Sequence, residues 1–134
     1  MPVPDAPSVV FPDAELVATG YLRANLTGVT VCTILPAGFE APIVRVQRLG
    51  GAWRFRKVLD DARLDVDCWA ATPAAVNDLI GDLRAVLEAS AGYVASDGLI
   101  TFSRELSGPT WRPEDRSDLC RKGLTHQLMI RPVY

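Results

Sequence analysis

The sequence predicts a single α+β domain, in which a small, largely antiparallel sheet of about four to five strands carries two main helices on one face. Three observations predict this class. Residues 64–70 alternate apolar and polar side chains, which is the period of a half-buried strand. Residues 73–89 place apolar side chains at offsets of three and four, which is the period of an amphipathic helix. The other strand-like segments come in runs before and after that helix, and such segregation favours an α+β arrangement.

The first half of the chain contains one predicted helix and two further strand-like segments. A helix is expected over residues 13–26, with Leu16 on its apolar face. Short β-branched runs predict strands over residues 29–35 and 43–49. The second of these strands is expected to end at Gly50-Gly51, because paired glycines interrupt a strand pattern.

The second half is organised around the helix that follows residue 70. Thr72 is its predicted N-cap and Pro73 its first residue. Its apolar side is formed by Val76, Leu79, Ile80, Leu83 and Leu87. A strand is expected over residues 99–106, a polar loop over 107–117 and a final strand over 121–131.

The length of 134 residues suits one domain, which we expect to span residues 11–134. Residues 1–10 are expected to form a flexible tail, because three prolines oppose regular structure there. Neither a signal-peptide pattern nor an apolar stretch of about 20 residues is present, so we expect a soluble protein without a membrane partner.

Charge and cysteine content narrow the function classes. With 14 Lys and Arg against 16 Asp and Glu, the net charge is -2, which argues against a dedicated nucleic-acid binder. Cys32, Cys68 and Cys120 form no CxxC pair and no cluster with histidine, so no zinc site is expected. Gly50-Gly51 matches no phosphate-binding motif, so no nucleotide site and no cofactor are expected. Cysteines inside apolar runs behave as small hydrophobes, which suggests a reducing compartment.

The acidic residues Asp60, Asp61, Asp65 and Asp67 are the first candidates for chemistry. Asp65 and Asp67 lie on the same side of one predicted strand, and paired carboxylates can hold Mg²⁺ in a metal-dependent nuclease. A solvated sheet face is the favoured interpretation. His126 is the only histidine, and its position between Leu124 and Leu128 on one strand face predicts a satisfied, half-buried side chain rather than a catalytic base.

Two segments combine aromatic residues with cations. The first is the basic hairpin, which we define as Trp53, Arg54, Phe55, Arg56 and Lys57. Protein contact is the favoured interpretation there, with nucleic-acid binding and plain hairpin packing as alternatives. The second is Trp111-Arg112, between two prolines, which suggests a docking loop. The open alternative is that Trp111 folds back over the sheet edge.

Two motifs carry a family resemblance: R-x-D-V-D-x-W-A-x-T at residues 63–72 and S-G-P-x-W-x-P at residues 107–113. Further points of agreement are the helix expected over residues 13–26, the Leu35-Pro36 step and the final Ile130-Arg131-Pro132. Together these features resemble the tail terminator proteins of long-tailed bacteriophages, in particular those of phages that infect actinobacteria.

The resemblance implies a structural virion protein without catalytic residues. It implies a ring, usually of six copies, that caps the tail tube, ends tail growth and joins the head-side neck. The implied partners are further copies of the chain, the tail tube protein and neck or head–tail connector proteins. DNA would pass through the lumen without specific binding, with Asp65 and Asp67 as possible lumen charges.

The same resemblance implies a place at the head-proximal end of the virion tail, after assembly in the host cytoplasm. A head–tail connector subunit of the neck is the alternative within this structural class. For the ring contacts, the basic hairpin and Trp111-Arg112 are the two candidate surfaces.

Overall fold

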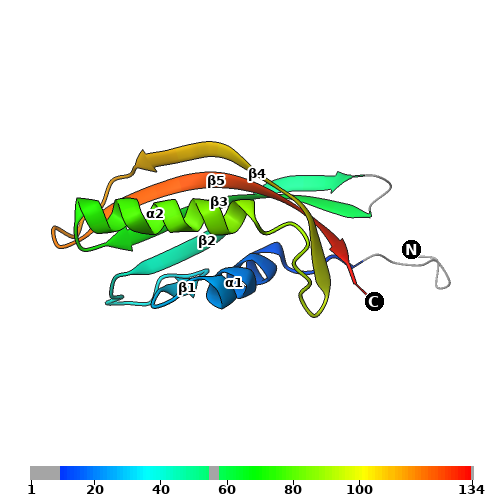
Figure 1. The fold of residues 1–134 in the computed structure, drawn as a ribbon, viewed down its shortest axis with the longest axis horizontal. Helices are drawn as coiled ribbons and strands as arrows, with labels where there is room; N and C mark the ends of the chain where they lie inside the picture. Colours follow the sequence, from blue (N-terminus) through cyan, green and yellow to red (C-terminus); the bar gives the residue numbers. More distant parts are fainter. Residues whose placement is uncertain (1–9, 55–57, 134) are drawn as a thin grey trace.

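The computed structural model describes residues 10–54 and 58–133, with residues 53 and 54 described through their backbone only. The elements follow the order α1 (Ala14–Asn25), β1 (Thr30–Cys32), β2 (Ile43–Arg54), β3 (Leu59–Ala70), α2 (Pro73–Glu88), β4 (Gly98–Trp111) and β5 (Cys120–Pro132) (Figure 1). This arrangement confirms the predicted α+β class.

The five strands form one sheet in the order β1-β2-β3-β5-β4. Three of its strand pairs, β2–β3, β3–β5 and β5–β4, are antiparallel. The short strand β1 pairs in parallel with β2. The sheet is therefore largely antiparallel, as predicted, and its two edges are the three-residue β1 and the fourteen-residue β4.

Helix α2 supplies much of the core. Thr72 caps it by accepting a hydrogen bond from the Ala75 N–H at 3.1 Å, and the five predicted apolar residues of the helix are buried. They pack in one cluster with Leu64, Val66 and Cys68 of β3. Burial raises the pKa of the Cys68 thiol to about 12, as expected for a cysteine that packs as a hydrophobe.

Helix α1 packs against the same cluster, with Ala14, Val17, Ala18, Tyr21 and Leu22 buried. The prediction for Leu16 is wrong, since this side chain is 62% exposed on the opposite side of the helix. The Tyr21 hydroxyl donates to the Val86 carbonyl at 2.6 Å and ties α1 to α2. Neither helix in the described part of the chain is long and apolar enough to cross a membrane.

Two predicted strand ends are wrong, because strand pairing continues beyond the glycines of one strand and beyond the proline of the other. Strand β2 passes Gly50 and Gly51, which take positive φ angles of 112° and 101°, and the register shifts there as in a β-bulge. A Cβ on Gly51 would overlap the carbonyl oxygen of Asp61. Strand β4 likewise continues through Gly108 and Pro109 to Trp111, with several register shifts, where a loop was predicted.

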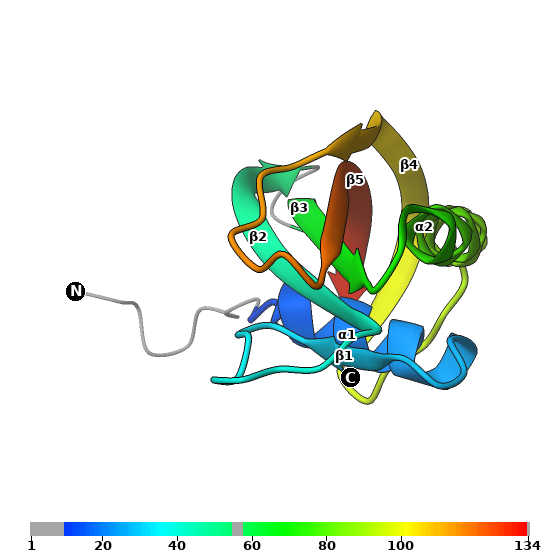
Figure 2. The same cartoon turned by 90° about the vertical axis from the view of Figure 1, so that its left-hand side faces the viewer.

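The two faces of the sheet have different covers. Leu64, Val66 and Cys68 face the helices, so the alternating residues Asp65, Asp67 and Trp69 face the other way. Figure 2 shows α2 on one side of β3 and β5, and the connection between β4 and β5 crossing the other side towards β2. Residues 112–119 of this connection cover the second face, and several of their side chains form the candidate site described below.

Candidate functional site

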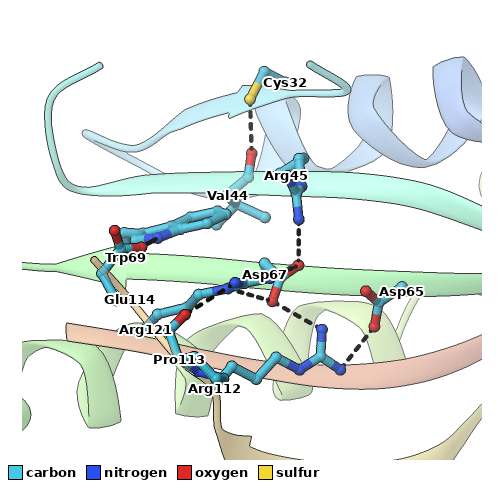
Figure 3. Close-up of polar contacts among 10 residues, drawn as sticks. All are labelled: Cys32, Val44, Arg45, Asp65, Asp67, Trp69, Arg112, Pro113, Glu114 and Arg121. Atoms are coloured by element: carbon cyan, nitrogen blue, oxygen red, sulfur yellow. Dashed lines mark hydrogen bonds and ion pairs between the residues drawn. The ribbon is translucent and has the colours of Figure 1, made fainter. Parts of the chain in front are cut away.

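A network of three arginines and two aspartates lies under the β4–β5 connection (Figure 3). One oxygen of Asp67, Oδ2, accepts from Arg45 at 2.8 Å and pairs with Arg121 at 3.1 Å. The other, Oδ1, accepts from Arg112 at 2.8 Å and from Arg121 Nε at 3.1 Å. Arg112 also pairs with Asp65 at 2.7 Å. We call these five residues the Asp67 network.

The expectation of a solvated acidic face is wrong for this strand. Asp67 is 0% exposed, because the side chains of Arg112 and Arg121 lie against it. Both arginines are distant from Asp67 in the sequence. Burial alone would raise the pKa of Asp67, but hydrogen bonds from Arg121 and Arg45 and the charge of Arg112 outweigh it, and the pKa lies below its usual range. Asp67 therefore stays ionised and cannot present its charge to a lumen.

The network also bears on the nuclease alternative. Guanidinium groups occupy both oxygens of Asp67 and one of Asp65, and these are the atoms that a divalent cation would need. The other two candidate acids are engaged as well: Arg48 binds Asp60 through two contacts of 2.6 Å, and Gln127 donates to Asp61 at 2.6 Å. Among residues 10–54 and 58–133, no group of three or more His, Cys, Asp or Glu side chains could hold a metal ion.

Gly123 makes room for Arg112. It pairs with Thr110 on one side and Asp67 on the other, and a Cβ at this position would overlap the Arg112 guanidinium. Arg112 therefore crosses β5 to the aspartates through space that a side chain at residue 123 would occupy. Sequence reasoning missed Gly123, because the Arg112 side chain that it accommodates comes from another strand and leaves no pattern in the residues around Gly123.

Gly123→Ala is expected to destabilise the domain by about 1–3 kcal/mol, because the added methyl group displaces a guanidinium that is held by two ion pairs. Urea unfolding measures the loss. Gly81→Ala is the matched control: nothing lies within 4 Å of a Cβ there, and alanine in the helix should raise stability by up to about 1 kcal/mol. An unchanged midpoint for Gly123→Ala would show that Arg112 is not confined as described.

Trp69 contacts both the β1–β2 connection and the β4–β5 connection, on the sheet face that carries the Asp67 network. Its ring lies between the guanidinium groups of Arg45 and Arg121, at 5.3 and 5.2 Å from the ring centroid. Its indole N–H donates to Glu114, and its edge contacts Phe39 with a centroid distance of 5.5 Å. The side chain is 1% exposed, so it anchors the β4–β5 connection instead of presenting a surface.

A second contact fixes this connection to the one between β1 and β2. Arg116 donates to the Phe39 carbonyl at 2.6 Å and lies 4.9 Å from the Phe39 ring centroid. It also forms two hydrogen bonds with Asp118, of 2.9 and 3.2 Å. The connection is thus attached at Arg112, Glu114 and Arg116, and this attachment sets the position of the residue just before it, Trp111.

Trp111 is the last residue of β4 and is 56% exposed, so it does not fold back over the sheet edge. Its strand partner is Lys122, whose ammonium group lies 4.3 Å from the ring centroid. The backbone N–H of Arg112 donates to the Arg121 carbonyl at 3.1 Å and holds the strand end. Of the two predicted docking residues, Trp111 faces solvent and Arg112 is directed at the aspartates.

The basic hairpin is described only in part. The backbone of Trp53 and Arg54 continues β2, opposite Asp60 and Leu59. The side chains of these two residues, and Phe55, Arg56 and Lys57 as a whole, lie outside the described residues. The role of this hairpin remains a prediction.

His126 is satisfied, as predicted, but it is fully buried, with 1% exposed, where a half-buried side chain was predicted. Its Nε2 lies 2.6 Å from the Ser103 hydroxyl oxygen, a contact that the sequence did not reveal. Ser103 donates its own proton to the Leu87 carbonyl at 2.6 Å, so the imidazole N–H must be the donor to Ser103. Burial lowers the pKa of His126, with Glu88 and Glu105 opposing it. A general base would have to accept from the serine, so this pair is a structural one.

Comparisons with known proteins add a family. The family model described as "Phage tail termination protein" matches residues 10–133. Among solved structures, the chain is similar to one from the "Virion of native gene transfer agent (GTA) particle", with a TM-score of 0.54 and 21% sequence identity, over 87% of this chain and 95% of that chain. At this identity the likeness concerns the fold. No curated protein matches the chain.

Proposed function

The chain belongs to the family of phage tail termination proteins, and on that premise we propose that it forms a ring which caps the tail tube, ends tail growth and offers the surface for joining the head or neck. Membership of the family makes it a structural protein of the virion tail. The observation that carries the proposal is the family match over residues 10–133, which include every described residue.

The geometry supports a role in assembly. A closed ring requires each copy to offer two different surfaces, one to each neighbour. The two sheet edges differ in this way, since β1 has three residues and β4 has fourteen. The Asp67 network and the Arg116 contacts hold the β4–β5 connection, so Trp111 is presented from a fixed position.

The same proposal includes the copy number of the ring, its position in the virion, its partners and its contact residues. The ring has six copies and lies at the head-proximal end of the tail, after assembly in the host cytoplasm. It contacts the tail tube protein on one side and neck or head–tail connector proteins on the other, and DNA passes through its lumen without specific binding. Trp111 contributes one contact, beside Arg112, whose guanidinium group is held by Asp65 and Asp67, and the basic hairpin contributes another.

Trp111→Ala is expected to lower the fraction of capped tail tubes, because exposed aromatic anchors dominate interface energies. A loss of about 2 kcal/mol corresponds to roughly a 30-fold weaker contact. The protein is mixed with purified tail tubes, and ring-bearing tube ends are counted by electron microscopy. Phe102→Ala, at a half-exposed aromatic residue of the same strand, is the matched control.

The outcome separates the two structural roles. Rings of the unsubstituted protein on tube ends support a terminator, and their loss in Trp111→Ala supports this contact. Binding to neck proteins without any binding to bare tube ends would instead support the connector alternative and overturn the proposal.

A further inference from the structure

An apolar groove of about 400 Å³ lies between the residues that precede β1, the end of β3 and the first half of α2. Val29, Pro42, Ala71 and Leu79 contribute apolar atoms to it. A second hollow of about 360 Å³ shares Val29 and Leu79 and continues along α2 to Val86. Together they form what we call the α1–α2 groove.

Two carboxylates border the α1–α2 groove. Asp78 and Asp82 are exposed on α2, one helical turn apart, and Asp82 lines both hollows. Neither forms an ion pair with another described residue, in contrast to Arg84 on the same helix, which binds Glu105 through two contacts of 2.8 Å. An apolar floor with an unpaired acidic border suits an apolar side chain that carries a cation next to it.

The chain presents such a pair at the end of β4. Trp111 is 56% exposed, and the Lys122 ammonium group lies against its ring at 4.3 Å. Lys122 also lacks an ion pair within the described part of the chain. The charge left unpaired on this surface is therefore opposite in sign to the charge left unpaired at the groove.

The two surfaces of one chain cannot meet, because α2 lies between them. Arg84 extends from one flank of α2 to Glu105 of β4, the strand that ends in Trp111. Asp78 and Asp82 lie on the other flank, next to Val29 and the start of β1. Since β4 and β1 are the opposite edges of the sheet, contact between the surfaces requires a second copy and joins the copies head to tail.

We propose that Trp111 of one copy inserts into the α1–α2 groove of the next copy, with Lys122 placed against Asp78 and Asp82. The inference rests on the proposed ring, because a head-to-tail contact closes into a ring when its rotation permits. It identifies the partner of the exposed tryptophan as the chain itself, and it gives each copy one donor surface and one acceptor surface.

A charge exchange tests the pairing. Lys122→Asp and Asp82→Lys are each expected to weaken self-association about tenfold or more, because each places like charges together. The double variant is expected to recover most of that loss, since the opposite charges face each other again. Asp97→Lys is the matched control, as it makes the same charge change at an exposed residue away from both surfaces.

Self-association of the full chain in solution is measured by analytical ultracentrifugation. Ring occupancy on tail tubes is counted by electron microscopy. Recovery in the double variant supports the pairing; single variants without effect, or a double variant no better than the worse single one, overturn it. Unchanged rings on tubes in every variant would reject this contact and leave the proposed cap intact. Charge rescue in solution without any capping would reject the cap and keep the contact.

Discussion

Replacing Asp67 with asparagine is expected to destabilise the domain by about 3–5 kcal/mol, because it leaves the largely buried guanidinium groups of Arg45 and Arg121 without a carboxylate and Arg112 with Asp65 alone. A domain of this size has roughly 5–15 kcal/mol of total stability, so the variant should fold but unfold at a clearly lower urea concentration. Tryptophan fluorescence, to which Trp69 contributes from its buried position beside the network, and far-UV circular dichroism report the transition.

The matched control is Asp118→Asn. Asp118 pairs with Arg116 at 2.9 Å, but its side chain is 65% exposed, so the same substitution should leave the urea midpoint nearly unchanged. Equal effects of the two variants would contradict the larger stabilising contribution expected from the buried Asp67 network.

Acid should act on the same group. The pKa of Asp67 is lower in the folded protein than its usual value of about 3.9, so its contribution is complete above that value. As the pH falls below about 4, the unfolded chain binds the proton first and the contribution is progressively lost. Asp67→Asn removes this component, so the difference in stability between the two proteins should shrink on acidification. A difference that is constant from pH 6 to pH 3 would contradict the low pKa.

Leu83→Asp is expected to prevent folding at 25 °C. Leu83 is 0% exposed and lies in the cluster between α2 and the sheet, where a carboxylate would find neither water nor a cation. The loss of the leucine costs about 2–5 kcal/mol, and burial of an unpaired charge adds several more, which together match the whole stability of a domain. Circular dichroism and one-dimensional NMR should show no cooperative transition.

Leu16→Asp is the control, because it makes the same substitution at a leucine of α1 that is 62% exposed. This variant should remain folded with nearly unchanged stability. Leu83→Ala should also fold, with about 2–5 kcal/mol less stability. A native-like Leu83→Asp protein would contradict the placement of this helix face in the core.

The local pattern of apolar residues was sufficient to predict where α2 begins and which faces of α2 and β3 are buried. Thr72 and Pro73 mark the start of α2, and the spacing from Val76 to Leu87 identifies its buried side, as the structure confirms. The alternation of Leu64, Val66 and Cys68 identified the core face of β3 in the same way. Strand ends were harder, because pairing with a neighbouring strand includes Gly50 and resumes at Thr110, directly after Pro109, in spite of the local tendency to turn.

The candidate site depended on contacts that periodicity cannot predict. The sequence identified Asp65, Asp67 and Trp111 as notable, yet it could not pair Asp67 with Arg112 and Arg121, which are 45 and 54 residues away. It also gave no reason to single out Gly123, whose role is to leave space for another residue's side chain.

By itself, the sequence determined the fold class, the helix that organises the core and a family resemblance that the family match confirms. The tertiary structure decided that the acidic face is buried under arginines, that Trp111 ends a strand and faces solvent, and that an acid-bordered groove lies on the other flank of α2. The physical reason is that burial patterns repeat along the chain at short range, whereas charge pairing and grooves depend on which distant segments the sheet brings together.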